Sequence, residues 1–131
     1  MKKAIIFTDG CAEPNPGPAA IGFTIRDERG KLLASVCQAI GHATNNQAEY
    51  RAIIAALEKA SGLGVNQVEI RSDSELIVRQ INGQYRVKNA DLKPLYLKVK
   101  QLQSRMTTFS ISHIPREQNS EADGLASQAL H

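Results

Sequence analysis

Apolar and polar positions near the start of the chain follow the patterns of strands. Lys3–Thr8 is an apolar run that stops at the turn pair Asp9-Gly10, which predicts a buried strand. Residues 20–26 alternate apolar and polar side chains, and Leu32–Ala39 follows after a polar turn sequence. The chain is therefore predicted to begin with a strand and a β-hairpin, joined by a proline-rich loop over residues 11–18.

Helical periodicity dominates the rest of the chain. Thr44–Gly62 has a face of alanines and begins with the capping box Thr44-x-x-Gln47. After a short strand over Asn66–Arg71, a second capping box, Ser72-x-x-Glu75, predicts a helix that ends at Asn82-Gly83. The last predicted elements are a helix over Ala90–Arg105, a strand over Thr107–His113, a loop over Ile114–Asn119 and a helix over Ser120–Leu130. This order predicts one α/β domain over residues 1–131, with a mixed sheet covered by helices.

The composition is that of an ordinary globular domain. The 131 residues carry a net charge of +3, and 42% of them are apolar. The apolar runs are shorter than the roughly 18 residues that a membrane span needs, and polar residues after Phe7 interrupt the segment that resembles a signal peptide. Cys11 and Cys37 form neither a disulfide framework nor a metal-binding cysteine pair. We therefore expect a cytoplasmic protein that does not bind membranes.

Four acidic residues stand where the predicted strands end or helices begin. They are Asp9 after the first strand, Glu49 in the first long helix, Asp73 after the fourth strand and Asp123 in the first turn of the last helix. Each has a simpler interpretation, because Asp-Gly pairs form turns, acids favour helix N-termini and a glutamate suits an exposed helix position. If the four converge, however, cations must offset their repulsion. Carboxylates without Cys or His favour Mg²⁺ or Mn²⁺, and two such ions can act together on a phosphodiester.

These acids lie in four short motifs that resemble those of type 1 ribonucleases H. The motifs are Thr8-Asp9-Gly10 with Asn15-Pro16-Gly17, Thr44-Asn45-Asn46-x-Ala48-Glu49, Ser72-Asp73-Ser74 and Asn119-x-x-Ala122-Asp123-x-Leu125-Ala126. The resemblance covers nearly the whole chain and implies a five-stranded mixed sheet whose first three strands are antiparallel. It also implies an enzyme that cuts the RNA strand of RNA–DNA hybrids and leaves 5′-phosphate and 3′-hydroxyl ends. The four acids would then hold two Mg²⁺ ions, for which Mn²⁺ is a possible substitute.

The resemblance further implies residues that contact the hybrid along its minor groove, where 2′-hydroxyls distinguish RNA from DNA. They are Cys11, Asn15, Gly17, Asn45, Asn46 and Gln47. Simpler roles exist, because Asn45 or Asn46 could cap the helix and Asn15 could form a turn. We favour a role in substrate recognition for Asn45 and Asn46, because a helix has a single N-cap position and only one of the two can occupy it.

Basic residues are concentrated between residues 71 and 105, a segment with a net charge of +5 against −2 for the rest of the chain. Phosphate contacts from such a segment give affinity that is independent of sequence, although a solvated helix face explains most of these residues equally well. Arg86 and Lys88 are the better contact candidates, because they lie in a connection rather than on a helix.

That connection is short, with only eight residues between Asn82 and Asp91. Some ribonucleases H carry an extra helix and a basic loop at this point, as a handle for the hybrid. The sequence therefore resembles the compact, handle-less branch of the family found in archaea and some bacteria. We expect a bare catalytic domain that acts as a monomer without an obligate protein partner.

The segment before Asp123 offers two candidates for assisting the reaction. His113 lies at a predicted strand end, and Arg116 lies in the loop that follows. An arginine stays protonated and is no general base, but it can hold a phosphate or help a leaving group depart. We favour Arg116, because the compact branch commonly shows Pro-Arg here. Asn119 is expected to cap the last helix and orient Asp123; the alternative is that it approaches the nucleophilic water.

Two other functions fit the same features. One is a nuclease of the same fold that acts on double-stranded RNA or DNA. The other is a catalytically silent module that binds nucleic acid. A silent module is expected to have lost at least one acid, and all four are present here.

Overall fold

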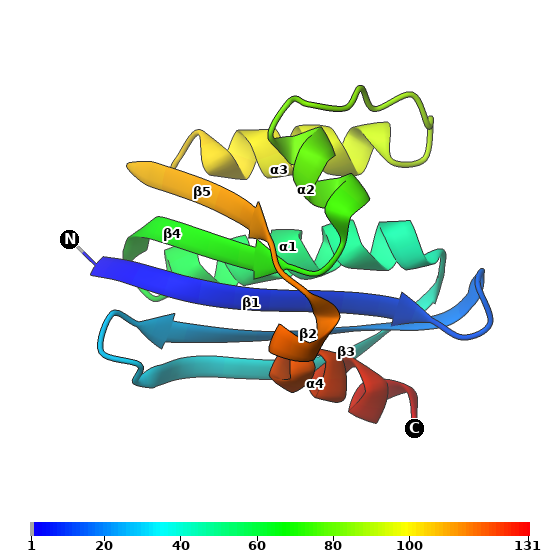
Figure 1. The fold of residues 1–131 in the computed structure, drawn as a ribbon, viewed down its shortest axis with the longest axis horizontal. Coiled ribbons are helices and arrows are strands. Elements are labelled where there is room, and N and C mark those ends of the chain that lie inside the picture. Colours follow the sequence, from blue (N-terminus) through cyan, green and yellow to red (C-terminus); the bar gives the residue numbers. More distant parts are fainter. Residues whose placement is uncertain (1) are drawn as a thin grey trace.

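The computed structural model describes residues 2–131 and shows a five-stranded sheet with helices on both faces (Figure 1). The strands are β1 (Lys2–Ala12), β2 (Gly17–Asp27), β3 (Leu32–Ala43), β4 (Val65–Ser72) and β5 (Thr108–His113). The helices are α1 (Asn45–Gly62), α2 (Glu75–Ile81), α3 (Lys93–Gln103) and α4 (Ser120–Leu130), with a 3₁₀ helix, η1 (Arg116–Gln118), before α4.

Strand β1 lies at the centre of the sheet, whose order is β3-β2-β1-β4-β5. The first three strands are antiparallel, and β4 and β5 run parallel to β1. The predicted mixed sheet is therefore confirmed. Helix α1 packs on one face and α4 crosses the other in front of β2 and β3 (Figure 1). This arrangement brings the carboxyl ends of β1 and β4 to the same end of the sheet. In α/β folds, functional groups gather at that end.

Two glycines let the helices approach the sheet closely. A Cβ atom on Gly10 of β1 would lie 2.2 Å from the backbone carbonyl carbon of Ala48 in α1. A Cβ atom on Gly22 of β2 would lie 2.5 Å from the carbonyl oxygen of Ala122 in α4. These contacts are therefore open only to glycine. The alanine face predicted for the first helix is also buried against the sheet, at Ala48, Ala52 and Ala56.

Strand β1 is longer than predicted. The Asp9-Gly10 pair does not end it, because pairing with β2 continues as far as Ala12 opposite Ala19. The predicted loop over residues 11–18 shrinks accordingly to residues 13–16. Asp9 thus projects from within a paired strand, which fixes its backbone more firmly than a turn would.

The two predicted capping boxes have different outcomes. At α1 the box forms, because the Gln47 N–H donates to the Thr44 hydroxyl and the Thr44 N–H donates to the Gln47 side chain. At α2 the prediction is wrong. The N-cap residue is Ser74, which makes no side-chain capping bond, and Ser72 belongs to β4. The Ser72 hydroxyl instead accepts a hydrogen bond from the Ser74 N–H and shapes the turn that holds Asp73.

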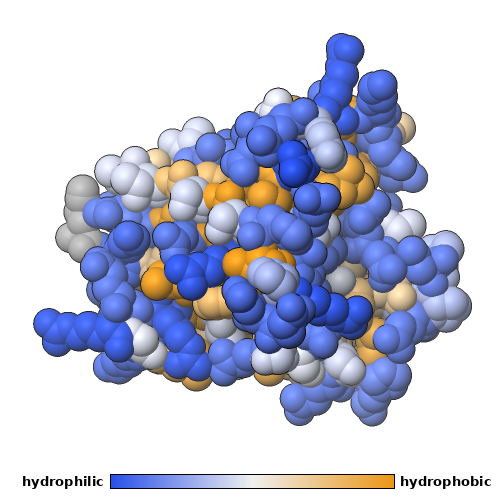
Figure 2. Space-filling model, in the orientation of Figure 1, coloured by the Kyte–Doolittle hydropathy of each residue, from blue (hydrophilic) through white to orange (hydrophobic). Residues whose placement is uncertain are grey.

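Among residues 2–131, no helix is both long enough and apolar enough to cross a membrane. The face that carries α4 is mostly hydrophilic, with apolar patches that are small and separate (Figure 2).

Candidate metal centre

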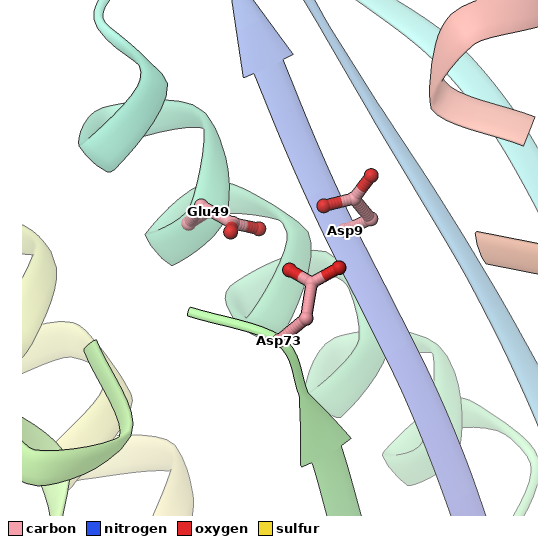
Figure 3. A group of neighbouring side chains, drawn as sticks. All are labelled: Asp9, Glu49 and Asp73. Atoms are coloured by element: carbon pink, nitrogen blue, oxygen red, sulfur yellow. The ribbon is translucent and has the colours of Figure 1, made fainter. Parts of the chain in front are cut away.

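Three carboxylates meet where β1, β4 and α1 converge. Asp9 projects from β1, Glu49 from the second turn of α1, and Asp73 from the turn after β4, each toward the others (Figure 3). One oxygen atom of each lies within 4.8 Å of one oxygen of the others. Three segments far apart in the sequence thus present their acids to one small volume.

The close approach at Gly10 explains why Glu49 faces inward. The Gly10 N–H donates a 2.7 Å hydrogen bond to Oε1 of Glu49, and the glutamate is only 9% exposed. The interpretation of Glu49 as an ordinary exposed helix residue is therefore wrong. This bond uses one carboxylate oxygen and fixes the direction of the other.

Asp123 joins the same cavity from the opposite face of the sheet. The cavity has a volume of about 420 Å³, and the residues that line it include all four acids and Arg116. Asp123 lies close enough to Asp9 to interact with it directly. An Nη atom of Arg116 lies 3.6 Å from Oδ1 of Asp123, and the arginine is 78% exposed. Its guanidinium is therefore largely in solvent and free to reorient toward a phosphate.

Burial and the neighbouring charges raise the pKa of two of these acids, Asp9 and Glu49. Burial, and then the charges of Asp73 and Asp123, raise the pKa of Asp9 to about 8. Burial and the charge of Asp9 likewise raise the pKa of Glu49 above its ordinary value. Groups that resist ionisation together in this way are stabilised by a bound cation. The oxygen-only donor set of the cluster fits a hard divalent ion such as Mg²⁺ or Mn²⁺.

The raised pKa of Asp9 predicts that the metal-free protein loses stability as the pH rises. The folded state keeps a proton that the unfolded chain releases near pH 4, so the free energy of unfolding falls between about pH 4 and about pH 8. Each pKa unit corresponds to about 1.4 kcal/mol, or roughly 3 to 5 °C in Tm at this size. Thermal melts without divalent cations should show this fall, and Mg²⁺ should raise the Tm more at pH 8 than at pH 5. Equal Mg²⁺ effects at the two pH values would contradict the assignment.

Five of the residues expected to contact a hybrid line one or both of two cavities, and Gly17 lines neither. Cys11, Asn45 and Asn46 line the carboxylate cavity. Asn15, Asn46 and Gln47 line a neighbouring groove of about 320 Å³. Asn46 thus lies between the two, which makes it central to this surface. Arg86 and Lys88 are exposed and line neither, and the same holds for His113 at the end of β5.

Several of these side chains also hold the scaffold together. Oδ1 of Asn45 accepts a hydrogen bond from the Ala12 N–H, and Oδ1 of Asn15 accepts one from the Asn45 N–H. Gln47 serves the capping box, and a Cβ atom on Gly17 would lie 2.5 Å from the Pro14 carbonyl oxygen. Over residues 2–131 the structure gives no such bond to the Asn46 side chain, which leaves its amide available to a ligand.

The second groove contains a residue that the sequence analysis missed. Asn89, from the connection between α2 and α3, lines it together with Asn15 and Asn46. Its side chain also accepts hydrogen bonds from the N–H groups of Asp91 and Leu92. The Asn-x-Asp sequence ahead of a helix indicates such a turn, but nothing in it indicates the groove.

Several basic residues between positions 71 and 105 interact with other groups of the protein itself. Lys100 donates to the Ile81 carbonyl oxygen at the end of α2, and Arg79 pairs with Glu75 and lies over the Tyr85 ring. Lys100 is therefore a partly buried structural residue, and the expectation of a solvated helix face does not hold for it.

Both cysteines are free thiols. Cys11 is half-buried beside the acids, and burial followed by the charge of Asp9 raises its pKa to about 11. It therefore remains protonated near neutral pH, and its thiol is a poor nucleophile.

Comparison with known proteins gives consistent matches. A family model described as "Reverse transcriptase-like" matches residues 7–129. The chain is 41% identical to Ribonuclease HI of Halobacterium salinarum, over 95% of this chain and 62% of that protein. It is 40% identical to a bifunctional protein of Mycobacterium tuberculosis, over 98% of this chain but 35% of that protein. The chain thus spans less than two thirds of these relatives. It is also 32% identical to a Ribonuclease H of Erythrobacter litoralis, over 98% of this chain and 96% of that protein.

Solved structures agree with the sequence matches. RNase H1 of Halobacterium salinarum superposes with a TM-score of 0.95 at 40% identity, covering 98% of this chain and 97% of that one. LC11-RNase H1, in a complex with an RNA/DNA hybrid, superposes with a TM-score of 0.92 at 45% identity, covering 97% and 96%.

Proposed function

Because this chain belongs to the ribonuclease H family, we propose that it is an endonuclease that hydrolyses the RNA strand of RNA–DNA hybrids. The observation that carries the proposal is the meeting of Asp9, Glu49 and Asp73 within 4.8 Å, in a cavity completed by Asp123. The similarity to a structure that holds an RNA/DNA hybrid supports the substrate. In this proposal residues 1–131 act as one catalytic domain.

The four acids would hold two divalent cations, Mg²⁺ by preference or Mn²⁺. When bound there, such ions supply positive charge to the attacking and departing oxygens of an in-line displacement. Asp9 is central to the set, because Asp73 and Asp123 both interact with it. Glu49 offers Oε2, because Oε1 accepts the hydrogen bond from Gly10.

The proposed reaction adds water across one phosphodiester bond of the RNA strand. The water oxygen bonds to phosphorus, the bond from phosphorus to O3′ breaks, and O3′ takes a proton. The products carry a 5′-phosphate and a 3′-hydroxyl. Arg116 would place its positive charge beside the scissile phosphate, because it lines the cavity and lies 3.6 Å from Asp123.

Substrate selection is assigned to neutral side chains on the surface that joins the cavity to the second groove. Neutral amides both donate to and accept from a 2′-hydroxyl, which a DNA strand lacks. Asn46 borders both the cavity and the groove, and Asn15 and Asn89 face the groove. Arg86 and Lys88 remain proposed contacts to more distant phosphates, because they are exposed but line neither cavity.

Replacing Asn46 with alanine should raise the KM for a hybrid about tenfold, the equivalent of one hydrogen bond to the substrate. The Tm should stay constant, because the Asn46 amide makes no bond within the described part of the chain. Asn45→Ala is the matched comparison and should lower the Tm, because it removes the acceptor of the Ala12 N–H. Steady-state kinetics and thermal melts separate the two effects. An unchanged KM in Asn46→Ala would remove this residue from the binding surface.

Replacing Arg116 with alanine should lower kcat about a hundredfold. Losing one hydrogen-bond donor that is oriented toward developing charge in a transition state has an effect of this size. His113→Ala should retain kcat within about twofold, because His113 lies outside the cavity. Single-turnover cleavage of a hybrid at saturating Mg²⁺ measures both. Retained activity in Arg116→Ala with a loss in His113→Ala would reverse the assignment.

The function itself is tested by offering purified protein matched RNA–DNA, RNA–RNA and DNA–DNA duplexes with Mg²⁺ or Mn²⁺, followed by analysis of the product ends. Cleavage confined to the RNA strand of the hybrid supports the proposal. Cleavage of RNA–RNA or DNA–DNA instead identifies a different nuclease of the same fold. Binding without cleavage of any duplex identifies a silent module.

A further inference from the structure

Strand β1 extends beyond its parallel neighbour. Pairing with β4 stops at Thr8 opposite Ser72, but β1 continues to Ala12. Along the edge of β1 that β4 leaves unpaired, three side chains form hydrogen bonds with the β1 backbone. Asn119 donates to the Thr8 carbonyl oxygen at 2.9 Å, the Gly10 N–H donates to Glu49 at 2.7 Å, and the Ala12 N–H donates to Asn45 at 2.6 Å.

These three contacts fall on alternate residues of β1. Backbone groups two residues apart point to the same edge of a strand, so residues 8, 10 and 12 face the same side. The side chains therefore replace the hydrogen bonds that a longer β4 would provide. Asp9 lies between the first two contacts, so its position depends on both.

Asn119 differs from the other two residues in where it is anchored. It is only 1% exposed and immediately precedes α4. Its backbone carbonyl accepts the Asp123 N–H at 3.0 Å, and its N–H donates to the Arg116 carbonyl oxygen at 2.9 Å. The expectation that its side chain caps α4 is wrong, because that side chain makes no capping bond and reaches β1 instead.

We propose that Asn119 is a positioning residue that sets the distance between Asp9 and Asp123. This inference rests on the proposed function, in which those two acids share a divalent cation. One end of the residue is fixed to the carbonyl just before Asp9, and the other to the first turn of the helix that bears Asp123. Without the amide, the hydrogen bond that joins the β1 backbone to the start of α4 beside the acids is lost, and the two carboxylates can move apart. Residues that orient metal ligands in this way typically contribute ten- to a hundredfold to metal affinity or activity.

The test compares Asn119→Leu with Gln80→Leu. Gln80 is also a buried amide, but it accepts a hydrogen bond from the Tyr50 hydroxyl and neither residue lines the acidic cavity, so both variants lose one buried hydrogen bond. Calorimetric titration with Mg²⁺ alone, and with Mn²⁺ alone, measures cation affinity without substrate. Asn119→Leu should weaken it about tenfold and raise the Mg²⁺ concentration for half-maximal cleavage equally, while the KM for the hybrid stays near the wild-type value. Gln80→Leu should lower the Tm comparably and leave cation affinity unchanged.

A second measurement separates positioning from general loosening. In an Asp123→Asn background, Asn119→Leu should no longer change cation affinity, because one of the two acids that it positions is gone. If Asn119→Leu folds poorly, Asn119→Ala is measured in the same way. The inference is overturned if cation affinity is unchanged while the Tm falls, or if the loss of affinity persists in the Asp123→Asn background. Because the titrations use no nucleic acid, they stand even if the wild-type protein cleaves no duplex.

Discussion

Asp9→Asn should reduce the cleavage of an RNA–DNA hybrid by about a thousandfold or more, the largest effect expected from any single substitution in this protein. Asp9 lies nearest to the centre of the acidic cluster, with Glu49, Asp73 and Asp123 all interacting with it. Removing its charge weakens the attraction of the whole cluster for cations, because Asp9 is the acid that interacts with the other three. The change is nearly isosteric, so the fold should remain intact.

The same substitution should stabilise the metal-free protein at pH 8. Burial and two neighbouring acids oppose the ionisation of Asp9, and asparagine removes that repulsion. The Tm without divalent cations should therefore rise, and the rise produced by Mg²⁺ should nearly disappear. Loss of activity with a gain in stability is characteristic of a functional residue rather than a structural one.

Glu117→Gln provides the matched control, because Glu117 is an exposed carboxylate in η1 that does not line the cavity. It should retain wild-type rates and the wild-type response to Mg²⁺. Single-turnover cleavage and thermal melts of both variants decide the question. Intact hybrid cleavage by Asp9→Asn in Mg²⁺ would falsify the assignment of the acidic cluster as the catalytic centre.

Gly10→Ala should destabilise the fold by about 3 kcal/mol, the second large effect. The added Cβ atom would lie 2.2 to 2.5 Å from backbone atoms of Ala48 and Glu49, and backbone moves less easily than a side chain. Helix α1 must therefore shift away from β1. That shift also lengthens the hydrogen bond from the Gly10 N–H to Glu49. Cation affinity should therefore fall together with the stability of the fold.

Gly62→Ala is the control for the glycine substitution itself. Gly62 ends α1, and an added Cβ atom there meets nothing within 4 Å. Alanine should be neutral or slightly stabilising at this position, because it restricts the unfolded chain more than glycine does. Urea denaturation of both variants measures the difference. Equal stability of Gly10→Ala and the wild-type protein would show that β1 and α1 do not depend on this close contact.

Local patterns in the sequence predicted most of the fold. The capping box at Thr44 and the alanine face of α1 follow from contacts within one helix, and both are present. The end of β1 was not predicted, because Asp9-Gly10 is a turn signal locally, whereas pairing with β2 determines the structure. The second capping box failed for a related reason, because β4 extends through Ser72.

The acids of the candidate site were recognisable because each lies in a short motif. The hydrogen bonds that support these acids were not predictable, because they join segments far apart in the chain. Asn119 and Thr8 are 111 positions apart, and no local pattern indicates their hydrogen bond. The motif predicts a substrate contact for Asn45 but gives no sign that its Oδ1 also accepts a hydrogen bond from the Ala12 backbone. Sequence motifs therefore indicate which side chains carry the chemistry better than they indicate which ones hold them in place.

The hydrogen bond from the Gly10 N–H to Glu49 has a spectroscopic consequence. An amide proton bound to a carboxylate changes its NMR chemical shift when the charge on that carboxylate changes. The Gly10 amide resonance is therefore a reporter inside the cluster, at a backbone position that needs no label beyond ¹⁵N. Its shift during a Mg²⁺ titration would report occupancy beside Glu49 in the resting protein, before any nucleic acid is added.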